Sequence, residues 1–192
     1  MRQASDGQAP HGQAPHGQAS HGHASHGQAG AGEGLPRGAR LGVDVGKARI
    51  GLAGSDPDGL IATPVETVPR VLDATGPDSA DIRRIAEEVE ERFAAVVYVG
   101  LPRHLSGQEG AATADARAFA ERLAAAVAPV EVRMVDERMS TVAATSTLRA
   151  AGRKAKSHRP VIDQVAAVII LQSALDAEKA AGTRAGELVQ TT

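Results

Sequence analysis

The sequence predicts an α/β protein with a mixed five-stranded sheet, in which an N-terminal antiparallel hairpin is extended by parallel strands and helices cover both faces. The first observation behind this class is a pair of alternating apolar segments, 41–45 and 50–53, with Gly46 at the tight turn between them. The second is that later strand-like runs alternate with segments of helical periodicity, which is typical of parallel strands joined by crossover helices. The third is a strongly apolar segment from Pro160, which predicts a helix packed on the sheet.

The remaining elements follow the hairpin in a regular order. The run AAVVYV is apolar without interruption, as expected for a strand buried on both faces of a parallel sheet. The helical segments have apolar residues at helical spacing and charged residues between them. The expected elements are a strand at 63–68, a helix capped by Asp78 or Ser79, a strand at 94–99, a helix at 113–127, a strand at 130–135, a helix at 141–151 and the helix from Pro160.

The chain divides by composition into a head, one domain and a short tail. Residues 1–36 are rich in His, Gly, Gln and Ala and repeat a pentad, so we expect them to be disordered. Residues 37–180 are expected to form the domain, and residues 181–192 a flexible tail. The histidines of the head either chelate a transition metal weakly or belong to a solvated segment without a specific role.

Composition excludes several classes of function. The 192 residues include no cysteine, which excludes disulfides, thiolate nucleophiles and thiolate zinc sites. The formal net charge is −2, so nucleic acid could be bound only by a local basic patch, and one Tyr and two Phe are too few for a base-stacking surface. The absence of cysteine also suits a cytosolic protein. We find no apolar stretch of spanning length and no signal peptide, and we expect no membrane partner.

Asp44 interrupts the apolar hairpin and is the first candidate for a functional residue. A carboxylate among buried apolar residues is costly to desolvate unless a cation, a hydrogen-bond network or water meets it. Asp44 is therefore either a metal ligand or a structural residue that hydrogen-bonds the turn of its own hairpin.

Two further elements are expected to bring acids to the same edge of the sheet. Asp136 and Glu137 end the last predicted strand, and because neighbouring residues of a strand point to opposite faces, only one of them can easily share a site with Asp44. Asp163 lies in the first turn of the last helix, where it could instead stabilise the helix dipole. Converging carboxylates repel each other unless divalent cations such as Mg²⁺ or Mn²⁺ lie between them, and two such ions can promote cleavage of a phosphodiester.

Basic residues close to these acids are candidates for contacts with substrate phosphates. The segment RKAKSHRP just before Asp163 is the densest positive patch of the chain, although it could equally be a solvated loop. A glycine-rich loop follows the strand at 94–99, where open α/β sheets bind their ligands. The expected phosphate contacts are Arg103, Arg138, Lys154, Lys156 and Arg159.

Four stretches of the sequence resemble the YqgF (RuvX) family, whose members are described as Holliday-junction resolvases and pre-16S rRNA nucleases. In family order they are LGVDVGKARIGLAGSD, VVYVGLP, VDERMST and RKAKSHRPVIDQVAAVIILQ. The resemblance covers roughly residues 37–175 and implies a ribonuclease H-like fold in the bacterial cytoplasm. It also implies a metal-dependent nuclease site carried by Asp44, Glu137 and Asp163, with Asp136 assisting, and a role in maturation of the 16S rRNA 5′ end. In the expected mechanism Asp44 bridges two magnesium ions, and Glu137 and Asp163 complete one ion each.

Several functions are consistent with this resemblance. The expected partner is precursor rRNA or branched DNA, with ribosomal particles as a further candidate. A junction resolvase would need two symmetry-related sites and hence a homodimer. A non-catalytic rRNA- or ribosome-binding assembly factor would carry the acids too far apart to hold metal. An ATPase of the actin type is disfavoured, because the chain has one copy of the hairpin and lacks the length for a second domain.

Overall fold

The protein, described here as a computed structural model, is built around one six-stranded mixed sheet with strand order β3-β2-β1-β4-β5-β6. The described residues are 35–102, 110–137 and 159–191. The strands are β1 (Ala39–Val45), β2 (Arg49–Ser55), β3 (Ala62–Pro69), β4 (Ala94–Leu101), β5 (Glu131–Asp136) and β6 (Glu187–Leu188). The helices are α1 (Ala80–Glu91), α2 (Ala111–Val127) and α4 (Arg159–Ala181).

Strand pairing confirms the predicted mixed sheet. The strands β1, β2 and β3 pair in antiparallel fashion, whereas β4 pairs in parallel with β1 and with β5. The carboxyl ends of β1, β4 and β5 therefore lie along one edge of the sheet. This edge, called the carboxyl edge below, also holds the start of β2, because β2 runs back from the hairpin turn.

The predicted number of five strands is wrong by one. The additional strand β6 pairs antiparallel with β5, and it lies within the segment expected to form a flexible tail. The Arg133 side chain donates to the Ala185 and Gly186 carbonyl oxygens at 2.7 and 2.9 Å and so fastens this segment to β5. A strand of two residues is too short for an apolar period to reveal.

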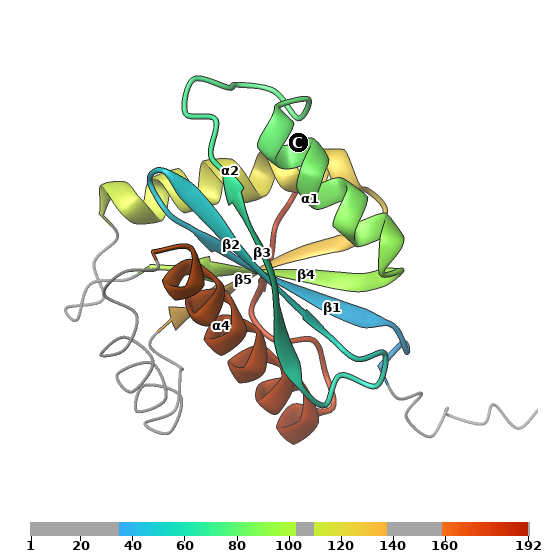
Figure 1. Ribbon diagram of the computed structural model, residues 1–192. Helices are drawn as coiled ribbons and strands as arrows, with labels where there is room; N and C mark the ends of the chain where they lie inside the picture. The colour runs from blue at the N-terminus through green and yellow to red at the C-terminus, as the bar shows by residue number, and fades with distance from the viewer. Residues whose placement is uncertain (1–34, 103–109, 138–158, 192) are drawn as a thin grey trace, which may run out of the picture. The chain divides into compact units, whose positions relative to one another are not determined.

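The helices lie on both faces of the sheet, as predicted (Figure 1). One face packs against α1 and α2 through a core that includes Leu41, Val43 and Val99. The opposite face packs against α4 through a second core that includes Tyr98 and Leu171. Because side chains alternate along a strand, the even-numbered residues of β1 face α4.

A buried ionic cluster holds the second half of α4 against the sheet. The Glu178 carboxylate accepts hydrogen bonds from Arg40 Nε at 3.1 Å, from Arg184 Nη1 at 2.7 Å and from the Tyr98 hydroxyl. Burial alone would raise the pKa of Glu178, but the hydrogen bonds from Tyr98 and Arg184 and the charges of the two arginines lower it. The cluster joins β1, β4 and α4, so it holds the second half of α4, the helix whose first turns lie at the carboxyl edge.

One of the predicted helices falls in a segment that the described residues do not include. The helix expected at 141–151 lies outside the described residues. None of the helices within the described ranges combines the length and the apolar character needed to cross a membrane.

Phe93 has a backbone conformation that usually requires glycine. It follows the end of α1 with a φ of 49°, and 86% of its surface is exposed. A residue with a Cβ atom costs roughly 1 to 2 kcal/mol in this left-handed region. We therefore expect Phe93→Gly to increase the free energy of unfolding by about 1 kcal/mol in urea denaturation. Phe93→Ala retains the Cβ atom and serves as the control, so equal stabilisation by both substitutions would contradict this explanation.

Candidate active site

Asp44 lies near the carboxyl end of β1 between two glycines of the neighbouring strands. It pairs directly with Gly51 on β2. On its other side Val43 pairs with Val99 of β4, so the next residue of β4, Gly100, lies beside Asp44. The side chain of Asp44 is partly buried on the face that packs against α4. Both flanking positions lack side chains, which leaves room for other groups to approach the carboxylate.

The two glycines allow two further acids to approach from opposite sides. A Cβ atom on Gly100 would lie 2.8 Å from Oε1 of Glu137, so this carboxylate lies directly over Gly100. A Cβ atom on Gly51 would lie 2.0 Å from the backbone oxygen of Asp163, so the first turns of α4 lie directly over Gly51. Elements β1, β5 and α4 thus bring Asp44, Glu137 and Asp163 to the carboxyl edge, as the element order predicts.

The carboxylates at this edge repel each other. The pKa of Asp44 rises from an ordinary value of 3.8 to about 7, first because of burial and then because of the negative charges of Glu137 and Asp163. Burial and the charge of Asp136 also raise the pKa of Glu137. Negative charge that is concentrated and poorly solvated is favourable only when a cation or a proton compensates it.

Asp163 has a cationic partner. Nε of Arg49, the first residue of β2, donates to Oδ2 of Asp163 at 2.8 Å. The two side chains are 37% and 27% exposed, so the pair lies at the rim of the site rather than in its interior.

Carboxylate oxygens are the donors that Mg²⁺ and Mn²⁺ prefer, so the chemistry of this donor set fits such an ion. Within the part of the chain that the structure describes, however, no three Asp, Glu or His side chains are arranged to hold one ion together. Asp44 and Glu137 face the same space, whereas the Asp163 carboxylate is bound to Arg49.

The structure distinguishes between the two adjacent acids of β5. Asp136 pairs with Leu101, which packs in the core beneath α1 and α2, so its side chain belongs to the face opposite Asp44. Glu137 follows the strand and reaches Gly100 beside Asp44. Glu137 is therefore the acid that shares the space of Asp44, and Asp136 acts on it through its charge.

The side chains predicted to contact substrate phosphates lie outside the described part of the chain. Arg103, Arg138, Lys154 and Lys156 lie outside the described residues, and Arg159 is the first residue of α4 but its side chain is also outside them.

Sequence reasoning overlooked two basic residues of the hairpin turn, Lys47 and Arg49. Lys47 is exposed in the turn, and Arg49 contacts Asp163. The Gly46 amide donates to the Arg49 carbonyl at 3.0 Å, and Nη1 of Arg70 donates to the Gly46 carbonyl at 2.9 Å. Arg70 also forms two hydrogen bonds of 2.7 and 2.6 Å with Asp115 of α2, so the turn is anchored to the helical layer. The available signal was that these basic residues follow the strand acid Asp44 by three and five positions.

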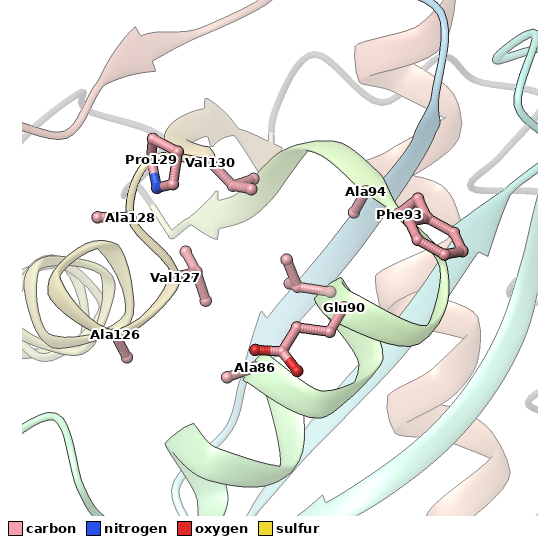
Figure 2. A pocket seen from close by; sticks show the side chains of 10 residues that line it. Ala86, Glu90, Phe93, Ala94, Ala126, Val127, Ala128, Pro129 and Val130 are labelled. Atoms are coloured by element: carbon pink, nitrogen blue, oxygen red, sulfur yellow. The ribbon is translucent and has the colours of Figure 1, made fainter.

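An apolar groove elsewhere on the molecule has a different character (Figure 2). It has a volume of 370 Å³ and lies between the end of α1, the start of β4 and the loop from α2 to β5. Among the described residues that line it, Glu90 is the only ionisable one. Because it lies where β4 begins, the groove is at the edge of the sheet opposite the acids, and its described lining offers no set of groups suited to catalysis.

The raised pKa of Asp44 predicts a pH dependence of stability. Asp44 holds a proton in the folded state up to about pH 7 but loses it near pH 3.8 when unfolded. The free energy of unfolding should therefore fall as pH rises through this window and become level above it. Asp44→Asn removes this contribution, so the variant should gain about 2 kcal/mol over the wild type between pH 5 and pH 8. Urea unfolding of both proteins in EDTA measures the difference, and a constant difference across this range would contradict the raised pKa.

A family model described as "RuvX: Holliday junction resolvase" matches residues 38–177 of the chain. A protein of Clavibacter sepedonicus named "Putative pre-16S rRNA nuclease" is 62% identical over 152 residues, which are 79% of this chain and 91% of that protein. A protein of Streptomyces avermitilis with the same name is 55% identical over 158 residues, which are 82% of this chain and 97% of that protein.

Two solved structures of RuvC share the fold. Thermus thermophilus RuvC in complex with a Holliday junction substrate aligns with a TM-score of 0.52 at 14% identity, over 76% of this chain and 98% of that chain. A second structure of the same enzyme aligns with a TM-score of 0.50 at 15% identity, over 78% and 99% of the two chains. This likeness confirms the ribonuclease H-like fold and, at such identity, shows the fold alone.

Proposed function

Because the chain belongs to the RuvX family, we propose that it is a metal-dependent nuclease that processes the 5′ end of precursor 16S rRNA in the cytoplasm. The observation that carries this proposal is the meeting of Asp44, Glu137 and Asp163 at the carboxyl edge. Their mutual repulsion is the electrostatic state that a bound divalent cation relieves. The names of the relatives in Clavibacter and Streptomyces support precursor 16S rRNA as the substrate.

The residues of the chain have distinct roles in this proposal. Asp44 and Glu137 would hold a divalent ion, and Asp163 would be a further ligand once its carboxylate leaves Arg49. The chemistry supplied by such an ion, when bound, would be positive charge that helps to activate water and to stabilise the leaving oxygen of a phosphodiester. The glycines Gly51 and Gly100 keep the space beside Asp44 free of side chains, and the anchored turn keeps the end of β1 in place.

Substrate phosphates require positive charge near the acids. Lys47, exposed in the hairpin turn two residues after the end of β1, can supply one such contact within the described part. The predicted residues Arg103, Arg138, Lys154, Lys156 and Arg159 stay candidates for the others. A row of such contacts would bind the backbone of a nucleic acid without reading its sequence.

Lys47→Gln should weaken binding to precursor rRNA severalfold and reduce the slope of log affinity against log salt concentration by about 1. The reason is that each phosphate contact made by a lysine releases about one counterion. Titrating fluorescent rRNA at several salt concentrations, in EDTA, measures both quantities. Lys179→Gln is the matched control, because Lys179 is exposed near the other end of α4. An equal effect of both substitutions would exclude a specific contact at Lys47.

A second candidate is resolution of branched DNA, favoured by the description of the family model and by the likeness to RuvC. This role would require the chain to form a dimer, so that two sites could cut two strands.

The deciding experiment compares precursor 16S rRNA with a four-way DNA junction, each incubated with the purified full-length chain with and without Mg²⁺. The expected result is Mg²⁺-dependent shortening of the rRNA at its 5′ end. Cleavage of the junction alone would establish the resolvase instead. Binding of precursor rRNA without any cleavage would replace the nuclease by an assembly factor.

A further inference from the structure

A cation of the protein itself lies among the acids of the carboxyl edge. Arg49 opens β2, and its Nε donates to Oδ2 of Asp163 at 2.8 Å. The pair joins residues 114 positions apart in the chain, so it forms only when α4 has packed on the hairpin. Asp44, in contrast, lies beside two other negative charges and has a strongly raised pKa.

The backbone on both sides of this ion pair is fixed. The Arg49 carbonyl accepts the Gly46 amide at 3.0 Å, which closes the hairpin turn. The Asp163 carbonyl lies so close to Gly51 that no Cβ atom fits there. The pair can therefore open only by rotation of its two side chains, which are 37% and 27% exposed and have solvent to move into.

Opening the pair would complete a set of ligands. As placed, the described acids do not form a group of three around one position. Asp163 is the member whose carboxylate is bound elsewhere, and its charge already acts on Asp44. A divalent ion at Asp44 and Glu137 would attract the Asp163 carboxylate and repel the Arg49 guanidinium.

We propose that Arg49 is a positioning residue that takes the place of the metal: it neutralises Asp163 while the site is empty and must be displaced before Asp163 can bind a divalent ion. This inference rests on the proposed metal-dependent function. Arg49 then competes with the metal, so removing it should tighten metal binding. The alternative is that Arg49 holds Asp163 ready for the metal, in which case removing it should weaken binding.

The test measures Mn²⁺ affinity by titration calorimetry on the full-length chain, at one pH and without nucleic acid. We expect Arg49→Gln to lower the dissociation constant about fivefold, because a partly exposed ion pair and one nearby positive charge are lost. Arg49→Lys keeps the charge and should stay close to the wild type. If Arg49→Gln does not fold, Arg49→Met preserves the aliphatic stem and replaces it.

Two controls isolate the effect of Arg49. Arg37→Gln removes the same charge from another arginine–aspartate pair, in which Arg37 contacts Asp58 at 2.6 Å. Arg37 precedes the start of β1, whereas Asp44 lies near the end of that strand, so this pair is far from the site. Asp44→Asn measures the background of Mn²⁺ bound elsewhere, including by the histidines of the head. Repeating Arg49→Gln in an Asp163→Asn background should remove most of the gain, since the released carboxylate is then absent.

The outcomes separate this inference from the proposed function. Tighter binding in Arg49→Gln, reduced by Asp163→Asn, supports it. If Arg49→Gln binds Mn²⁺ at Asp44 with unchanged or weaker affinity, the inference alone is overturned. It is also overturned if Arg49→Gln tightens Mn²⁺ binding just as much in the Asp163→Asn background. Binding no stronger than the Asp44→Asn background in every variant overturns both the metal site and the role of Arg49.

Discussion

Replacing Asp44 with Asn should reduce Mg²⁺-dependent cleavage of precursor 16S rRNA by about 10³-fold or more while the fold is retained. Asp44 lies between the other two acids, and the negative charges of both Glu137 and Asp163 raise its pKa. The amide has the same shape as the carboxylate but carries no charge, so it weakens the attraction for a divalent ion without creating a cavity. The measurement is the single-turnover rate of 5′-end cleavage at saturating Mg²⁺, with circular dichroism to verify folding.

Variants of the neighbouring acids complete this test. Glu137→Gln should reduce the rate by a comparable factor, whereas Asp136→Asn should have a much smaller effect, because Asp136 belongs to the opposite face of β5. Asp58→Asn, at an exposed position paired with Arg37, is the control for an Asp→Asn exchange away from the site. Full activity of the Asp44→Asn variant would remove Asp44 from the mechanism.

The sequence predicted the elements whose signal is periodic. The hairpin was predictable because apolar residues alternate on both of its strands, and Asp44 was conspicuous because it interrupts that alternation. The parallel pairing of β1, β4 and β5 followed from the alternation of strands and helices. That topology by itself predicts that Asp44, the end of β5 and the start of α4 lie at one edge of the sheet.

The features that remained unpredicted depend on single contacts. The pairing of β6 rests on two residues and on Arg133, and no period reveals it. The ion pair of Arg49 with Asp163 depends on how α4 is rotated over the hairpin, which apolar spacing does not determine to within one side chain. Which of Glu137 and Asp136 shares the space of Asp44 depends on the register between β4 and β5, and the sequence does not determine this register.

The carboxyl edge and the helix that packs on it are held in place by contacts on both layers of the fold. Repulsion among the acids opposes folding, so the surrounding structure must hold them together. Arg70 supports the hairpin turn from the α2 layer, and Glu178 fixes α4 from the other end. These contacts therefore hold the acids close together despite their repulsion, and a bound cation would relieve that repulsion.

The second large effect is expected at Gly51, where a single methyl group should disturb both stability and the site. A Cβ atom at this position would lie 2.0 Å from the Asp163 carbonyl oxygen and 2.5 Å from its carbonyl carbon. These are backbone atoms, so the clash can be relieved only by moving α4 away from β2. We expect Gly51→Ala to lower the free energy of unfolding by about 3 kcal/mol, as overpacking in a rigid core does.

The matched control is Gly54→Ala on the same strand. A Cβ atom at Gly54 would meet only side-chain atoms, the terminal nitrogen of Arg92 at 3.2 Å and Cγ2 of Val65 at 3.3 Å, and the flexible Arg92 side chain can move aside while Val65 need shift by only a few tenths of an ångström. Gly54→Ala should therefore change the free energy of unfolding by less than about 1 kcal/mol. Urea denaturation gives both values, and Mn²⁺ titration shows whether displacement of α4 also weakens the site. Equal stability of the two variants would mean that α4 is not held against Gly51, and the approach of Asp163 to Asp44 would then need another explanation.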